Sequence, residues 1–270
     1  MTACFSPLRF RLNSLRRATG NLSLFRNRGV KGQLVSMHQS GTHWLKHIIA
    51  CALANCFEIP PPKYNHANDI FGGPRDPVVY PLIPRLVSSH SNPHPFILFD
   101  LVHSMLDLPR YVLLVRDIRY SLLSNYAKWS HVYRVPFSTY LRGDVRGSTY
   151  NSDIWWAIRF LNHWGRVYER LPSRVTIVRY ESLMNDSTTE ISRLNEFWEL
   201  GLSQSDIDYG IRQSSKPMMA KKNDPERPEG AVRKSADAGL NSFSESDRDY
   251  LESICTNYLR FSAGYDYANW

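Results

Sequence analysis

The sequence lacks acidic residues over its first fifth. Its first carboxylate is Glu58, whereas eight lysines and arginines precede that position. The rest of the chain carries as many basic as acidic residues, so the formal net charge of +8 arises in the N-terminal part. An arginine-rich segment of this kind is typical of a transit peptide, of a solvated helix beside an anion site, or of a nucleic-acid-binding arm. We favour the helix, because the basic segment 1–30 runs without a linker into the loop discussed below.

Long hydrophobic runs and paired cysteine motifs are also missing. No apolar stretch approaches the roughly 20 residues that span a bilayer, and the longest, 48–57, is interrupted by Asn55. The four cysteines show no Cys-x-x-Cys spacing, which indicates reduced thiols in a cytoplasmic protein. Without repeats or low-complexity tracts, a chain of 270 residues that is 43% hydrophobic predicts one large α/β domain, here over 31–270.

Apolar patterns typical of strands and helices alternate along the chain. Residues 111–115 and 174–179 are short, largely apolar runs of the kind buried in a parallel sheet. Residues 42–57 have helical spacing, and Asp117 can cap a helix over 118–129. This alternation predicts a parallel sheet between helices, with ligands at the carboxyl ends of the strands. Helix caps are also expected at Ser187, Ser203 and Ser244, and a mobile basic lid loop at 216–238.

A small, hydroxyl-rich loop follows the first strand-like run. Residues 33–44 read Gln-Leu-Val-Ser-Met-His-Gln-Ser-Gly-Thr-His-Trp, and a helical pattern begins at Thr42. This layout points backbone N–H groups and a helix N-terminus at one place, as phosphate-binding folds do. The loop is not a Walker loop, because no lysine follows the glycine and no second glycine lies five residues before it.

The Ser-Gly-Thr-x-Trp core of this loop resembles the 5′-phosphosulfate loop of the sulfotransferases. The resemblance continues, in the family's order, over roughly residues 33–245. It implies a P-loop-like three-layer α/β sandwich with a central parallel sheet. It also implies 3′-phosphoadenylyl sulfate (PAPS) as cofactor, adenosine 3′,5′-bisphosphate as product and a small-molecule or glycan acceptor. By the same resemblance the loop's cofactor-binding residues are Gln39, Ser40, Gly41, Thr42, His43 and Trp44, the last stacked on the adenine.

A second segment, 85–90, is similar to the one that ends in the family's catalytic histidine. By resemblance His90 is the general base that deprotonates the acceptor hydroxyl. An imidazole with an ordinary pKa near 6.5 suits that role at neutral pH. The alternative is an ordinary surface-loop histidine, one of nine in the chain.

Four further segments resemble the family's nucleotide motifs. Arg116 at a strand end and Ser124 eight residues later have the spacing of the 3′-phosphate motif. A phosphate is a natural bidentate partner for such an arginine. The structural alternative is an ion pair of Arg116 with Asp117 or Glu181. The resemblance also assigns Tyr180 and Ser214 to the nucleotide site, and Arg233 and Lys234 to the 3′-phosphate.

Gln39 departs from the family pattern, which has a lysine or arginine just before Ser-Gly-Thr. A glutamine donates hydrogen bonds but carries no charge, and charge-assisted bonds are about twice as strong as neutral ones. His38, His43 or Lys46 can replace that charge. The departure leaves open a second reading, a sulfotransferase-like protein that binds the nucleotide without turnover.

Other functions fit the residues less well. A small-molecule kinase needs the Gly-Lys-Ser/Thr that this loop lacks. A nucleic-acid binder interleaves aromatic and basic residues, which the N-terminal segment does not do. His43 and His47 have the i, i+4 spacing of zinc ligands, but no glutamate stands at the zincin spacing, so no metal site is predicted.

Overall fold

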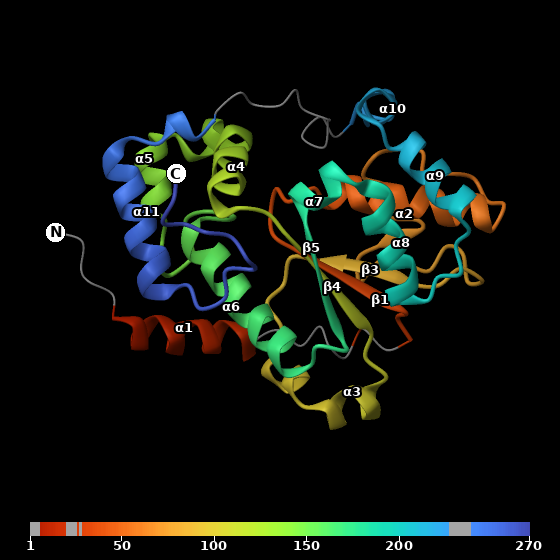
Figure 1. Ribbon diagram of the computed structural model, residues 1–270, viewed down its shortest axis with the longest axis horizontal. Helices are drawn as coiled ribbons and strands as arrows, with labels where there is room; N and C mark the ends of the chain where they lie inside the picture. The colour runs from red at the N-terminus through yellow and green to blue at the C-terminus, as the bar shows by residue number, and fades with distance from the viewer. Residues whose placement is uncertain (1–5, 20–25, 27–28, 227–238) are drawn as a thin grey trace.

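A five-stranded parallel sheet forms the centre of the computed structural model, which describes residues 6–19, 26, 29–226 and 239–270 (Figure 1). All neighbouring strands are parallel, in the order β2-β3-β1-β4-β5. The predicted parallel sheet is thus confirmed, and β4 and β5 each begin within one residue of the predicted strands. The strands are β1 (Gly32–Ser36), β2 (Phe71–Gly72), β3 (Leu86–Ser89), β4 (Arg110–Val115) and β5 (Val175–Arg179).

Helices cover both faces of the sheet, which makes three layers (Figure 1). One face is covered by α2 (Thr42–Cys56), α8 (Ser187–Trp198) and α9 (Gln204–Gln213). Packed toward the other are α1 (Pro7–Thr19), α4 (Ile118–Tyr133), α5 (Phe137–Arg142), α6 (Ile154–Arg170) and α11 (Glu245–Tyr258). The short elements are η2 (Pro95–Leu98), α3 (Asp100–Leu106), α7 (Tyr180–Asn185), α10 (Lys216–Lys221) and η4 (Leu240–Ser242).

The alternation of strand side chains divides the core in two. Leu114 packs with α2 and α8, whereas its neighbours Leu113 and Val115 pack with α6. Successive side chains of a strand point to opposite faces, so the apolar residues of β4 belong to the core on both faces of the sheet. The fully buried Trp198 of α8 donates from Nε1 to the carbonyl of Arg110 at 3.1 Å, which ties this layer to the start of β4.

The basic N-terminal segment contains a helix that packs on the core. In α1 the buried side chains are those of Phe10, Ser14 and Ala18. The Phe10 ring lies 5.4 Å from that of Trp155 and 5.5 Å from that of Tyr258, measured between centroids. The domain boundary that we place at residue 30 remains a prediction.

Most helix ends follow the local sequence. Asp117 caps α4, and Ser203 and Ser244 each form a capping box, as predicted. The cap predicted at Ser187 is wrong, because the carboxylate of Asp186 accepts from the N–H of Thr189 at 3.0 Å. The loop predicted from 216 is also wrong at its start, where α10 forms with a proline in its first turn. The remainder of that loop extends into residues outside the described ranges.

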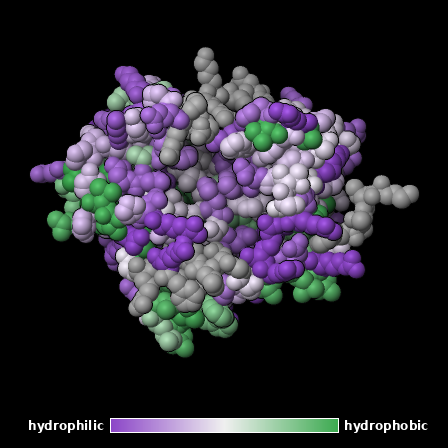
Figure 2. All heavy atoms as spheres, turned by 180° about the vertical axis from the view of Figure 1, so that it is seen from behind, coloured by the Kyte–Doolittle hydropathy of each residue, from purple (hydrophilic) through white to green (hydrophobic). Residues whose placement is uncertain are grey.

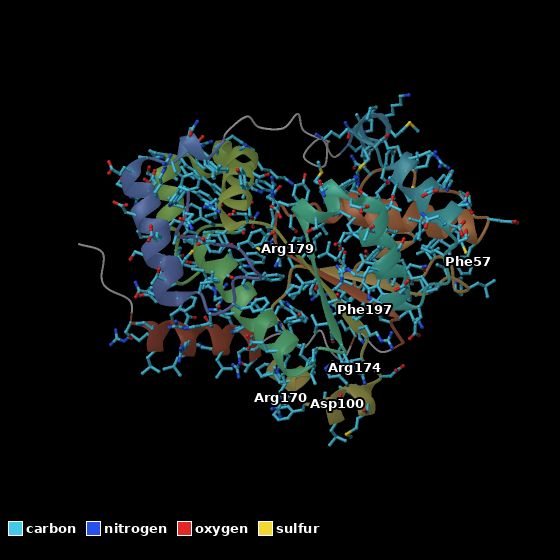
Figure 3. All side chains as sticks on the ribbon, viewed as in Figure 1. Phe57, Asp100, Arg170, Arg174, Arg179 and Phe197 are labelled. Carbon is cyan, nitrogen blue, oxygen red and sulfur yellow. The ribbon has the colours of Figure 1, made fainter. Side chains whose placement is uncertain are left out.

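The two ends of the sheet differ in what surrounds them. Figure 3 places Arg174 and Arg179 at opposite ends of β5, with Arg170 and Asp100 near Arg174. The loops that follow β1, β3 and β4 leave from the Arg179 end, which is the carboxyl end.

Seen from behind, the surface is largely hydrophilic, with hydrophobic side chains gathered at places along its lower margin (Figure 2). In the described part of the chain, no helix has the length and apolar character needed to cross a bilayer.

Candidate functional site

A cleft of about 440 Å³ opens at the carboxyl ends of the strands. Its walls come from the loops after β1, β3 and β4 and from α2, α4, α7 and α10. Ser40 is fully buried beneath it, and Arg233 and Lys234 lie outside the described residues. The other sequence-predicted site residues all line it: Gln39, Gly41, Thr42, His43, Trp44, His90, Arg116, Ser124, Tyr180 and Ser214.

The loop after β1 presents backbone N–H groups to this cleft. Gly41, with φ 88°, is the N-cap of α2, and no described side chain accepts a bond from the helix's first turn. Those N–H groups therefore suit an anion. The hydroxyl of Ser40 donates to the carbonyl of Met37 at 2.7 Å and closes the turn. A Cβ on Gly41 would lie 2.7 Å from the ring of Tyr180, so both the space and the φ angle call for glycine.

His90 is oriented by Ser36, the last residue of β1. Its Nδ1 lies 2.8 Å from the carbonyl oxygen of Ser36 and 3.2 Å from the hydroxyl. A carbonyl only accepts, so Nδ1 carries the proton and Nε2 is left as an acceptor. Thr42 donates to the same hydroxyl at 2.9 Å, which links His90 to the glycine loop. Burial, with smaller contributions from Lys46 and Lys128, lowers the pKa of His90, so the ring is neutral at neutral pH, as a base must be.

Aromatic rings continue the wall beside His90. The rings of His38 and His90 stack at 4.2 Å with an interplanar angle of 22°, and Trp156 lies 4.5 Å from His38. Burial lowers the pKa of His38 to about 3. The candidate base thus stacks on a second neutral imidazole, against which the Trp156 ring is tilted at 59°.

Arg116 extends into the cleft from the end of β4. Its Nη1 donates to the carbonyl of Gln39 at 2.9 Å, and its guanidinium lies 4.5 Å from the centroid of the Tyr180 ring. Its buried Nε has no hydrogen-bond partner among the described residues. Buried donors are nearly always paired, so this N–H fits a ligand that brings an acceptor.

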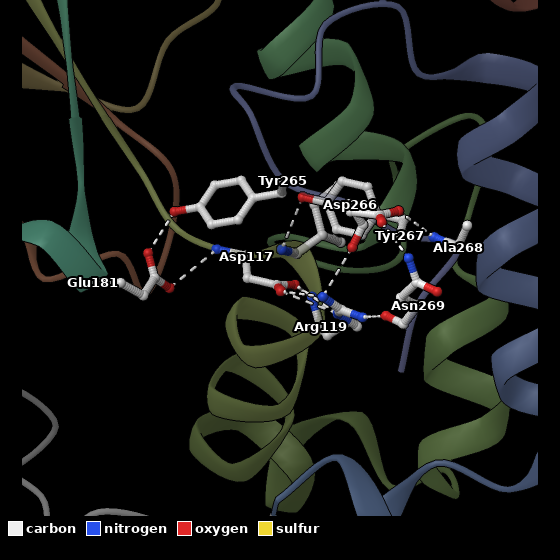
Figure 4. Close-up of polar contacts among 9 residues, drawn as sticks. Asp117, Arg119, Glu181, Tyr265, Asp266, Tyr267, Ala268 and Asn269 are labelled. Carbon is white, nitrogen blue, oxygen red and sulfur yellow. Dashed lines mark hydrogen bonds and ion pairs between the residues drawn. The ribbon is translucent and has the colours of Figure 1, made fainter.

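The two carboxylates that could have neutralised Arg116 are bound elsewhere (Figure 4). Asp117 pairs with Arg119 at 2.7 Å. Glu181 accepts from the hydroxyl of Tyr265 at 2.5 Å and from the N–H of Asp117 at 3.4 Å. Across the ranges that the structure describes, the alternative ion pair of Arg116 does not form, which leaves its charge for a ligand.

Trp44, Tyr180 and Ser214 form the other end of the cleft. Trp44 donates from Nε1 to the carbonyl of Ser214 at 3.0 Å, and its ring lies edge-on to that of Tyr180 at 6.3 Å. The hydroxyl of Ser214 is held by Nδ1 of His47 at 2.7 Å, so Ser214 fixes the position of Trp44. Within the described ranges, no three His, Cys, Asp or Glu side chains gather as a metal-ion site.

Three residues are candidates to replace the charge that Gln39 lacks. None of them places a cation in the cleft. Lys46 donates to Oδ1 of Asn68 at 2.7 Å outside the cleft lining, and burial lowers its pKa to about 8. The pKa of His38 lies at about 3 and that of His43 at about 4, both lowered first by burial, so both rings are neutral at neutral pH.

Lys128 is a cation of the cleft lining that sequence reasoning missed. It lines the cleft from α4, four residues after Ser124 and therefore on the same helical face. Its charge contributes to lowering the pKa of His38, His43 and His90, and Lys46 contributes more strongly for the last two. The i, i+4 spacing from Ser124 indicates the shared helical face, whereas the direction of the long side chain depends on how α4 packs. The lining is completed by Asn65, Met184, Ser215, Lys216 and Met219.

Comparison with known proteins identifies the family. The model of the sulfotransferase family matches residues 30–204. The chain belongs to the sulfotransferase family. No curated protein matches the sequence of this sulfotransferase.

Solved structures show the same fold at low sequence identity. Mouse sulfotransferase SULT7A1 complexed with PAP is 17% identical, with a TM-score of 0.60 over 93% of this chain and 91% of that one. Retinol dehydratase in a complex with retinol and PAP is 16% identical, with a TM-score of 0.62 over 95% and 88%. The same enzyme with androsterone and the inactive cofactor PAP scores 0.57 over 97% and 88%. The predicted P-loop-like three-layer fold is confirmed.

Proposed function

We propose that this sulfotransferase moves the sulfuryl group of PAPS to a hydroxyl, or an amine, of a small-molecule acceptor. The observation that carries the proposal is one cleft that holds an uncapped helix N-terminus, an arginine with an unpaired buried N–H, and a neutral histidine with a free acceptor nitrogen. The similar structures bound to PAP support the cofactor. The complexes with retinol and androsterone favour a small hydroxyl-bearing acceptor over a glycan.

The residues of the cleft fit the nucleotide part by part. The first turn of α2, with Ser40, Gly41, Thr42 and His43, offers N–H and hydroxyl donors to the 5′-phosphosulfate. Arg116 and Ser124 grip the 3′-phosphate, for which the unpaired Nε is suited. Trp44 and Tyr180 flank the adenine, while Gln39 contributes its backbone by holding Arg116. Arg233 and Lys234, outside the described residues, add cations at the 3′-phosphate in this proposal.

His90 acts as the general base. PAPS supplies the sulfuryl group and a phosphate leaving group when it is bound. Nε2 of His90 takes the proton of the acceptor hydroxyl as that oxygen attacks sulfur. The carbonyl of Ser36, bonded to Nδ1 at 2.8 Å, keeps the ring in the required tautomer and stabilises the imidazolium that forms.

Lys128 supplies the positive charge that Gln39 lacks. It lines the cleft one helical turn from Ser124, and its charge contributes to the lowered pKa of His38, His43 and His90. A cation here stabilises negative charge that develops on the transferring group, in a site where charges interact more strongly than in water. On this account Gln39 does not imply loss of turnover.

The test is transfer from PAPS to a panel of phenols, alcohols, sterols, amines and oligosaccharides, followed by mass spectrometry. We expect a sulfated product from at least one small hydroxyl compound. His90→Ala should lower the rate by about 10²-fold or more and leave PAP affinity nearly unchanged. His131→Ala, at an exposed histidine outside the cleft, is the matched control. Tight PAP binding with neither transfer nor PAPS hydrolysis would instead support a nucleotide-binding protein without turnover.

A further inference from the structure

One edge of the molecule exposes hydrophobic side chains that the proposed reaction does not use. In α1, Leu8, Leu12 and Leu15 are 66%, 59% and 45% exposed. Their i, i+4, i+7 spacing aligns them in one stripe along the helix. A different face of α1, which carries Phe10, packs on the core. The leucine stripe is therefore not what attaches the helix to the protein.

Arginines border this stripe on both sides, and α1 contains no acidic residue. With about 3.6 residues per turn, Arg9 and Arg16 lie along one side of the leucines and Arg11 lies along the other. Single exposed leucines are ordinary on a protein surface. An apolar stripe between rows of arginine is instead the pattern of a helix that lies in the surface of a membrane.

The apolar surface continues from α1 onto η2 and α3. Leu15 and Leu98 line one hollow, and Leu98 and Phe99 line a neighbouring hollow of about 410 Å³ together with Arg166 and Arg170. Figure 3 places Arg170 at this lower end of the molecule, and Figure 2 shows hydrophobic side chains at places along the same margin. Farther along the same edge, the exposed side chains are those of Phe96, Leu101 and Met105.

The charge around these hollows is mainly positive. Arg166 and Arg170 are exposed, and neither forms an ion pair within the described ranges of the chain. The acidic residues nearby are Glu169, in the wall of the larger hollow, and Asp100, which lies 3.9 Å from Arg174. Guanidinium groups beside exposed apolar side chains match a phospholipid surface, where phosphates border the hydrocarbon.

We propose that this edge, formed by α1, η2 and α3, docks on a membrane surface that contains anionic phospholipids. The leucines of α1 and the exposed side chains of α3 enter the interface, while the arginines contact the phosphates. Charge complementarity selects this partner. Burial of the flanking arginines against a neutral apolar surface would cost free energy, because their charges would be left unpaired. Since α3 leads into the amino end of β4 and the cleft lies at the carboxyl end, docking leaves the cleft open to water.

The experiment is co-sedimentation of the full chain with phosphatidylcholine vesicles, with and without phosphatidylserine. We expect binding only when phosphatidylserine is present, and weaker binding as salt is raised. Arg9→Gln/Arg16→Gln should weaken binding by about 30-fold at low salt. Arg75→Gln/Arg212→Gln removes two exposed charges elsewhere and should change binding little. Leu8→Ser/Leu12→Ser should also weaken it, by about tenfold or more, whereas Val132→Ser, at an exposed valine of α4, should not.

Several results would overturn the proposal. These are no binding to phosphatidylserine vesicles, equal loss in the edge variants and their controls, or binding that salt does not weaken. Leucine variants that abolish a dimer in analytical ultracentrifugation but still pellet with vesicles would assign the edge to a second copy of the chain. Circular dichroism melts check that every variant is folded. The assay uses no nucleotide, so its outcome is independent of the proposed reaction.

Discussion

Replacement of Lys128 by methionine tests whether the charge of Lys128 compensates for Gln39, which stands where the family usually has a lysine or arginine. Methionine keeps most of the side-chain length and removes the charge. Lys128 lines the same cleft as His90. If its charge acts over about 6 Å at an effective dielectric constant of about 20, Coulomb's law gives about 3 kcal/mol. A loss of this size in the transition state lowers kcat by about 10²-fold.

The assay compares kcat, PAP affinity and the pH dependence of kcat in wild type and Lys128→Met. PAP affinity should change little, because Arg116 and the first turn of α2 hold the phosphates. Removal of the positive charge should raise the pKa of His90 toward its ordinary value. Because the base must be neutral, the acidic limb of the profile should move to higher pH. Lys221→Met, at an exposed lysine outside the cleft lining, is the control.

A second substitution makes the test sharper. Gln39→Lys in the Lys128→Met background should recover part of kcat, because it returns a cation to the family's usual position. An unchanged kcat and pH profile in Lys128→Met would refute the role of Lys128. A fall in PAP affinity that accounts for the whole loss would refute it as well, because Lys128 would then bind the nucleotide only.

Three further predictions concern the loop, the base and the helix layer. Gly41→Ala should destabilise the protein by about 1–2 kcal/mol, because the backbone is left-handed at this position. It should also weaken PAP binding, because the added Cβ would displace the Tyr180 ring. Unchanged PAP affinity in a calorimetric titration would contradict this. Ser36→Ala should lower kcat by less than about tenfold, since the backbone carbonyl still orients His90; a loss as large as that of His90→Ala would show that the hydroxyl dominates. Gly210→Ala should lower Tm, because a Cβ would lie 2.5 Å from the carbonyl of Ile48. The expected shift is about 2–4 °C for each kcal/mol of stability lost. Gly239→Ala is the control and should leave Tm unchanged, because a Cβ there meets open space.

Much of the fold and site was predictable because strong local patterns encode them. The apolar run 111–115 is buried on both faces, and the turn at Gly41 requires a residue that tolerates positive φ. These features depend on the backbone and on nearest neighbours, which a sequence shows directly. The order of the motifs then placed His90 and Arg116 at the ends of the strands on either side of β1, where the cleft lies.

The errors and omissions arose where long-range contacts or closely competing residues decide the outcome. The cap of α8 is Asp186 instead of Ser187 because two adjacent residues can both accept from the first turn. Glu181 pairs with Tyr265, and Arg119, the partner of Asp117, also donates to the carbonyls of Asp266 and Asn269. These contacts come from the C-terminal segment, so no local pattern predicts them. Lys128 was missed because the direction of a long side chain toward a cleft depends on how α4 packs.

The most direct test of the account is calorimetric titration with PAP of the wild type, Arg116→Ala and the exposed-arginine control Arg75→Ala. The account predicts that wild type and Arg75→Ala bind PAP, and that Arg116→Ala binds at least about 10²-fold more weakly through the loss of charged hydrogen bonds. ATP, which lacks the 3′-phosphate, should bind the wild type much more weakly than PAP. No PAP binding by the wild type, or equal binding by all three proteins, would contradict the assignment of the cleft.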